Sequence, residues 1–119
     1  MTSLEMVKKT VKALDNKKAQ DIQVIKIDDL SPIADYFVIA TGSSTTQVKA
    51  LADEVDYQMS QAKIEPKRVE GYQSATWILL DYGDVVVHVF FSQARDFYSL
   101  ERLWSDGQNL DVAALLAED

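Results

Sequence analysis

The sequence lacks the residues that form covalent or metal-bound cross-links. Its 119 residues include no cysteine and a single histidine, His88. Disulfides and thiolate metal sites are therefore excluded, and the absence of cysteine favours a cytoplasmic location. A lone histidine is a poor metal site, and no nucleophile stands at a diagnostic spacing from it. We expect no metal and no cofactor, and we expect His88 to be either packed or facing a partner.

Long apolar runs are also missing. No run approaches the roughly 20 residues that are needed to span a membrane. The N-terminal stretch 1–14 is amphipathic and has no long apolar core, so it does not read as a signal peptide. We therefore expect no membrane partner, and the length predicts a single domain over residues 1–119.

Positive charge is scarce relative to negative charge. Twelve basic and nineteen acidic side chains give a net charge of −7. Such a chain is repelled by naked nucleic acid and attracted to basic surfaces. A partner rich in lysine and arginine is therefore expected, with little direct contact to RNA.

The stretch 75–91, ATWILLDYGDVVVHVFF, predicts two β-strands joined by a tight turn. Gly83 can take the positive φ that such a turn needs. With a two-residue loop, centred on Tyr82-Gly83 or on Gly83-Asp84, the strands have two distinct faces. One face is aliphatic. A three-residue loop would reverse which residues of the two strands share a face. The other face carries Trp77, Leu79, Asp81, Val86, His88 and Phe90.

These two faces predict different surroundings. The aliphatic face is expected to pack against a helix. The mixed face is either a second core layer or a surface that is partly uncovered and meets a partner. Aromatic residues with a few polar groups are typical of interface centres.

Periodicity predicts the remaining elements. A helix capped at Thr2-Ser3 is expected to run to about Lys18, burying Leu4, Val7, Val11 and Leu14. A second helix is expected from about Thr46 to Lys63, with Val48, Leu51, Ala52, Val55 and Met59 buried. Strands are expected in 21–30, with one face toward the core, in 35–42, which is nearly all apolar and so central, and in 67–71, near an edge. A short last helix is expected from about Arg95 to Trp104.

This order of elements, αββαβββα, predicts an α/β or α+β domain with one mixed five-stranded sheet flanked by helices. Residues 107–119 are expected to form a partly loose C-terminal tail, with a helical turn that docks or frays.

One enzymatic alternative lies at the turn Gly42-Ser43-Ser44, between a strand and a helix. A helix N-terminus with hydroxyl groups can hold a phosphate, and nucleotidyltransferases use a similar turn. Their metal-binding carboxylates are not matched here, because Asp53, Glu54 and Asp56 fall at helical positions. A two-metal transfer needs both oxygens clamped. We therefore expect no catalytic residues, and a nucleotide-binding enzyme remains the alternative.

Several segments together resemble the ribosomal silencing factor (RsfS, or Iojap) family. The resemblance runs from the first helix to Asp106, and its combination of motifs is highly specific. The matching segments are 35–44 (DYFVIATGSS), Gln47-Val48 with Ala50 and Ala52-Asp53, Glu70-Gly71, 77–90 (WILLDYGDVVVHVF), Arg95, Phe97-Tyr98, Leu100-Glu101, Leu103-Trp104 and Asp106.

The resemblance implies a fold like the nucleotidyltransferases without their catalytic residues. It also implies a repressor of translation under nutrient limitation. Such a protein binds the large ribosomal subunit through ribosomal protein number fourteen and blocks joining of the small subunit. Members of the family can form homodimers, so a dimeric scaffold for another partner is a further alternative. Together with the mixed face, the resemblance predicts a docking surface of Trp77, Leu79, Asp81, His88, Tyr98, Leu100, Glu101 and Trp104.

Overall fold

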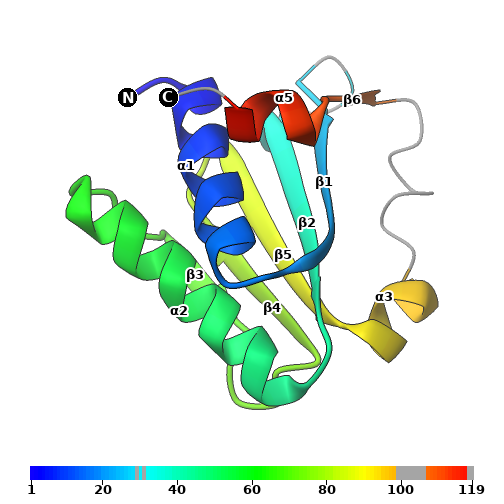
Figure 1. The fold of residues 1–119 in the computed structure, drawn as a ribbon. Helices are drawn as coiled ribbons and strands as arrows, with labels where there is room; N and C mark the ends of the chain where they lie inside the picture. The colour runs from blue at the N-terminus through cyan, green and yellow to red at the C-terminus, as the bar shows by residue number, and fades with distance from the viewer. Residues whose placement is uncertain (29, 31, 99–106, 118–119) are drawn as a thin grey trace.

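In the computed structural model, helices cover one side of a mixed β-sheet, and a single short helix lies at one end of the other side (Figure 1). The structure describes residues 1–28, 30, 32–98 and 107–117. The described strands lie in the order β3-β4-β5-β2-β1-β6. Six strands are present where five were expected. The extra one is β6 (Gln108–Asn109), which pairs antiparallel with β1.

The centre of the sheet is a parallel pair, β2 (Tyr36–Gly42) and β5 (Val85–Phe91). Antiparallel strands flank it, namely β1 (Gln20–Lys26) on one side and β4 (Trp77–Asp81) with the edge strand β3 (Arg68–Glu70) on the other. The apolar run in β2 therefore lies at the centre, as a strand covered on both faces should.

The β4–β5 hairpin confirms the two-residue loop, which is centred on Gly83-Asp84. Trp77 pairs with Phe90 and Leu79 pairs with His88. The Tyr82 N–H closes the turn on the Val85 carbonyl at 3.0 Å, and Gly83 takes a φ of +88°. We call the side bearing Trp77, Leu79, Asp81, Val86, His88 and Phe90 the aromatic face.

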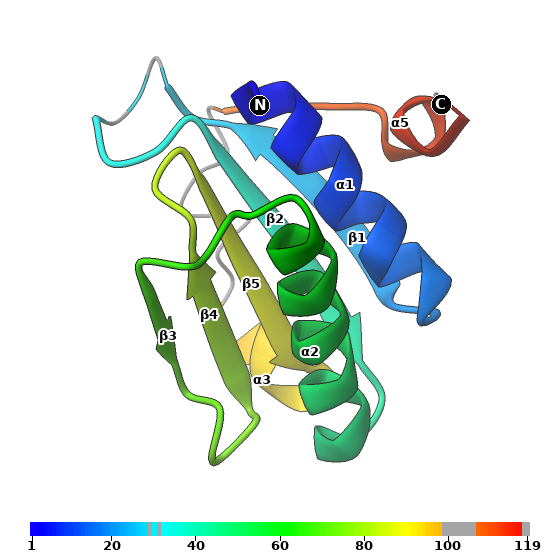
Figure 2. The same ribbon diagram turned by 90° about the vertical axis from the view of Figure 1, so that its left-hand side faces the viewer.

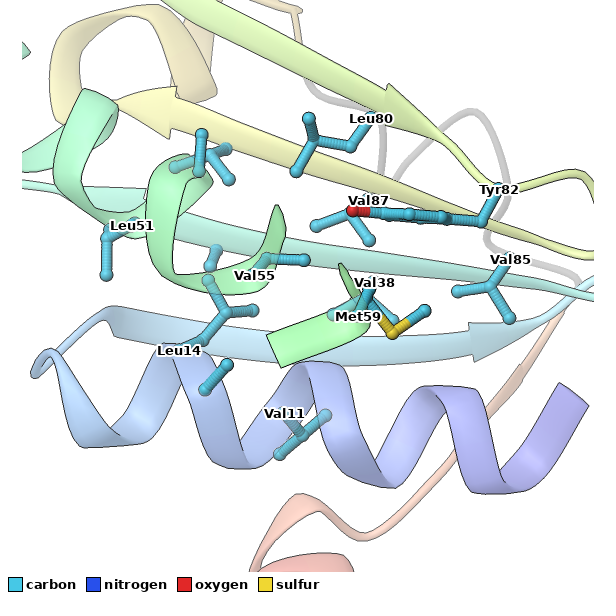
Figure 3. Packing of buried hydrophobic residues seen from close by; sticks show 14 of the residues in the cluster. Val11, Leu14, Val38, Leu51, Val55, Met59, Leu80, Tyr82, Val85 and Val87 are labelled. Atoms are coloured by element: carbon cyan, nitrogen blue, oxygen red, sulfur yellow. The ribbon is translucent and has the colours of Figure 1, made fainter. Parts of the chain in front are cut away.

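The opposite, aliphatic face packs against α1 (Ser3–Asn16) and α2 (Thr45–Gln61) (Figure 2). All five residues predicted for the buried stripe of α2 are buried. Figure 3 shows α1 and α2 directing Leu14, Val55 and Met59 toward Val38 and Val87 of the sheet. The Tyr82 ring lies in the same cluster, and its hydroxyl is buried without a hydrogen-bond partner in residues 1–28, 30, 32–98 and 107–117.

The buried stripe of α1 differs from the prediction at Leu4, which is 38% exposed. The stripe also contains Met6, Thr10 and Ala13. At about 100° per residue, Leu4 stands about 100° from the middle of this wider stripe. The Thr2 hydroxyl caps the helix by accepting the Glu5 N–H, and the Glu5 carboxylate accepts the Thr2 N–H.

Strand β1 was expected to bury one face, but both are buried. Val24 joins the cluster under the helices, whereas Ile25 and Ile27 join a second cluster on the other side of the sheet. Ile22 and Val24 face the helices as predicted, and the regular register from Gln23 to Lys26 places Ile25 on the opposite face, where the second cluster covers it.

The helix after β5 begins earlier than predicted. Helix α3 (Ser92–Tyr98) follows Phe91 directly, and Ala94 packs into the second cluster on the aromatic side. Near the C-terminus, α5 (Val112–Ala117) lies beside α1 (Figure 1). Its Leu115 joins the cluster under α1 and α2. Within the described residues, no helix combines the length and the apolar character that crossing a bilayer requires.

Candidate docking surface

Two large apolar side chains on the aromatic face are partly exposed. Trp77 and Leu79 both project from β4 and pack at the margin of the second cluster, in which Phe37, Ile39 and Phe90 are buried. Trp77 stacks on its cross-strand partner Phe90, with ring centroids 5.0 Å apart and planes 25° from parallel. A rigid aromatic ring that is packed against the core and still partly exposed suits an interface anchor.

His88 lies beneath this surface and is only 4% exposed. The Trp77 indole N–H donates to His88 Nδ1 at 3.1 Å. Phe37 meets the imidazole edge-on at 4.8 Å. The sequence left open whether His88 is packed or faces a partner, and this burial places it in the layer below Trp77.

Burial also fixes the charge state of His88. It lowers the pKa of the imidazole from its ordinary 6.5 to about 4, and the nearby Asp81 carboxylate opposes the shift only in part. The ring is therefore neutral at pH 7. Because Nδ1 accepts from Trp77, the proton sits on Nε2, which is buried and has no hydrogen-bond partner among the described residues.

Asp81 stands at the end of β4, where it has two structural partners. Its carboxylate accepts the Gly83 N–H at 2.8 Å, which tightens the turn, and pairs with Arg68 Nε at 3.3 Å. Its side chain is 22% exposed, so a partner protein can still reach it. The Asp81 carboxylate thus contacts both the hairpin turn and the edge strand β3, and it lies at the border of the aromatic face.

The edge strand adds two charged residues that the sequence reasoning missed. Arg68 pairs with Asp81 in register, Glu70 pairs with Leu79, and the Arg68 and Glu70 side chains form an ion pair at 3.2 Å. Paired residues of antiparallel strands share a face, so both border Leu79. Only the pairing of β3 with β4 shows that Arg68 and Glu70 lie beside Leu79. A strand of three residues is too short for its sequence pattern to predict that pairing.

The rest of the predicted surface depends on the last helix. Tyr98 is the final residue of α3, and its side chain is not among those that the structure describes. Leu100, Glu101 and Trp104 lie outside the described residues. Their convergence with Trp77 therefore stays a prediction from the sequence.

The Gly-Ser turn at the start of α2 uses its own polar groups. Ser44 is the N-cap and accepts the Gln47 N–H at 3.0 Å. The Gln47 side-chain oxygen accepts both the Ser43 N–H, at 2.6 Å, and the Ser43 hydroxyl, at 2.8 Å. This amide oxygen thus occupies two hydrogen-bond donors of the Gly-Ser turn. Among the described residues, no three histidine, aspartate or glutamate side chains are grouped to hold a metal.

Comparisons with known proteins identify the family. The model of the family described as "RsfS: Ribosomal silencing factor during starvation" matches residues 1–119. The chain belongs to the ribosomal silencing factor family. This confirms the resemblance drawn from the hairpin and the Gly-Ser turn.

Individual members of the ribosomal silencing factor family match over most of the chain. The ribosomal silencing factor of Halalkalibacterium halodurans is 40% identical over 117 residues, which span 98% of this chain and 100% of that protein. A crystal structure of a Chromobacterium violaceum protein is similar with a TM-score of 0.87, at 38% identity, and the match covers 93% of this chain and 92% of that one. A mouse protein named "mitochondrial assembly of ribosomal large subunit protein 1" is 32% identical over 117 residues. That match covers 92% of this chain and 51% of the mouse protein.

Proposed function

We propose that this protein silences ribosomes by occupying the large subunit. In this proposal it docks on ribosomal protein number fourteen and keeps the small subunit from joining, so that translation falls when nutrients are scarce. Family membership supports the ribosome as the target, and the name of the mouse relative connects that protein with the large subunit. The structural observation that carries the proposal is the partly exposed pair Trp77 and Leu79 on the aromatic face.

The docking surface that we propose is centred on this pair. Trp77 and Leu79 supply apolar area, and Asp81 supplies a carboxylate at the rim for a lysine or arginine of the partner. Interfaces of this composition, with aromatic anchors inside a polar border, are common between proteins. The proposal extends the surface to Tyr98, Leu100, Glu101 and Trp104, and it includes His88 as the support of Trp77.

The charge of the chain supports a protein partner over RNA. A net charge of −7 attracts a basic ribosomal protein and is repelled by RNA phosphates. The acidic character therefore favours docking on protein, with little contact to the surrounding RNA.

This function needs no catalysis. A folded domain of this size excludes the other subunit by its volume alone, so the proposal describes a protein that is not an enzyme. In bacteria it acts in the cytoplasm, where translation takes place. Off the ribosome, a second copy of the chain is the competing occupant of the aromatic face, and a dimer that buries Trp77 would oppose docking.

The proposal is tested by binding purified large subunits to the wild type and to Trp77→Ala. Truncating an aromatic anchor costs about 2 kcal/mol of binding, which is about 30-fold in Kd. Tyr57→Ala is the matched control, because Tyr57 is an aromatic residue 57% exposed on α2, over the opposite face. The expected result is weak binding for Trp77→Ala only. Equal binding by the wild type and a folded Trp77→Ala would overturn the docking surface.

A further inference from the structure

We infer that His88 is the positioning residue of the docking surface, which it serves by holding the Trp77 indole through a hydrogen bond rather than by touching the partner. This inference rests on the proposed function. It assigns separate tasks to two side chains that the sequence alone placed together as contacts.

The hydrogen bond is set by the register of the hairpin. Trp77 pairs with Phe90, and His88 pairs with Leu79, so Trp77 and His88 are diagonal neighbours on one face. Diagonal neighbours lie within reach only for long or aromatic side chains. Here the indole N–H reaches His88 Nδ1 at 3.1 Å, which fixes the rotation of the indole as well as its position.

The imidazole is itself held in place by its surroundings. Phe37 of β2 packs edge-on against it, and Phe90 of β5 lies nearly parallel to it, with ring planes 14° apart. These rings belong to the second core cluster. His88 therefore connects a buried, ordered layer to a tryptophan that is partly exposed.

The other nitrogen of His88 shows that the imidazole is costly for the fold. Nε2 carries the proton, is buried and meets no hydrogen-bond acceptor in the part of the chain that the structure describes. A buried donor without a partner costs stability, whereas a phenylalanine of similar shape would leave no such group. Packing alone therefore favours an apolar ring at this position. The acceptor at Nδ1 is the feature that a phenylalanine lacks.

A fixed indole benefits docking. A partly exposed tryptophan without its hydrogen bond can sample more than one rotamer, and binding must then order it. Orienting the ring in the free protein removes that cost and raises affinity without a new contact. His88 thus acts through Trp77.

The test uses two substitutions of His88 and one of Trp77. His88→Phe keeps an aromatic ring but removes the acceptor, and it is expected to fold and to bind large subunits about 10-fold more weakly. His88→Asn places a carbonyl oxygen near the position of Nδ1 and is expected to recover most of the affinity. Trp77→Phe removes the indole N–H, so adding His88→Phe to it is expected to change binding less than twofold.

A direct readout of the hydrogen bond accompanies binding. The indole N–H signal of Trp77, assigned by its loss in Trp77→Phe, is followed by two-dimensional NMR. It should shift and exchange faster in His88→Phe, which a purely structural role of His88 in packing would not require.

Wild-type affinity in His88→Phe would overturn the inference and leave the proposed function standing. The inference would also fail, with the proposed function intact, if His88→Phe weakened binding equally in the wild type and in Trp77→Phe. His88 would then act independently of the indole. No binding by the wild type would overturn the proposed function, and the inference with it.

Discussion

Arg95 of α3 donates a hydrogen bond of 2.7 Å to the hydroxyl of Thr41 at the end of β2, 54 residues earlier in the chain. The same Nη1 donates to the carbonyl of Asp21 at 2.5 Å. Arg95 is buried, so these bonds tie α3 to the ends of two strands. Arg95 therefore anchors α3 to the sheet.

Loss of this anchor should weaken the whole domain. Arg95→Ala leaves two acceptors without a charged donor, and hydrogen bonds to charged groups contribute about 1.5–3 kcal/mol each. We expect the free energy of unfolding to fall by about 3 kcal/mol in urea denaturation. Thr41→Val removes only one of the two bonds and should cost about half as much. Unchanged stability in Arg95→Ala would contradict the assigned anchor.

The buried imidazole of His88 predicts a pH dependence of stability. The pKa of His88 is lowered from 6.5 to about 4, so between these values the unfolded chain binds a proton that the folded protein does not. Stability is therefore complete above pH 6.5 and is lost as the pH falls toward 4. At pH 5 the loss attributable to His88 is about 2 kcal/mol. Urea denaturation at pH 7 and pH 5 measures it, and His88→Phe should lack this part of the pH dependence.

Gly71 should be intolerant of any side chain. Its φ is +79°, and a Cβ built on it would collide with the backbone carbonyl of Trp77. We expect Gly71→Ala to lower the free energy of unfolding by at least about 2 kcal/mol and to disturb large-subunit binding. Gly83→Ala is the control, because it shares the positive φ but meets only the flexible end of Lys67. If both variants lowered the free energy of unfolding by a similar, small amount, the close contact between Gly71 and the Trp77 carbonyl would be absent in solution, and the prediction would be wrong.

Tyr82 offers a stabilising substitution. Its hydroxyl is buried in the cluster under α1 and α2, where no described residue forms a hydrogen bond with it, and burial raises its pKa above the ordinary value of 10.0. Tyr82→Phe removes the unpaired group and keeps the ring, so thermal unfolding should show a gain of about 1 kcal/mol. A loss of stability would mean that the hydroxyl finds a partner, such as water, in solution.

The sequence predicts what local patterns encode. The Gly83 turn predicted the hairpin, with the two faces assigned on the condition of a two-residue loop, which the structure shows. The spacing of Val48, Leu51 and Val55 predicted the buried stripe of α2. The edge position of β3 also followed from its short, charged sequence. In each case, the residues that determine the feature lie within one short stretch of the sequence.

Features that depend on distant partners were not predictable in this way. Strand β6 is two polar residues long and exists through its pairing with Ile25 and Lys26 of β1. The burial of Arg95 depends on acceptors at Asp21 and Thr41, far away in sequence. The assignment of Arg68 and Glu70 to the rim of the docking surface likewise needed the register between β3 and β4.

The most direct test of the central claim is a subunit-joining measurement. Separated large and small subunits are mixed with the wild type, Trp77→Ala or Tyr57→Ala and resolved on a sucrose gradient. The account predicts that the wild type and Tyr57→Ala travel with the large subunit and lower the yield of joined ribosomes, whereas Trp77→Ala does neither. A wild-type protein that stays at the top of the gradient, or that binds the large subunit and leaves joining unchanged, would contradict it.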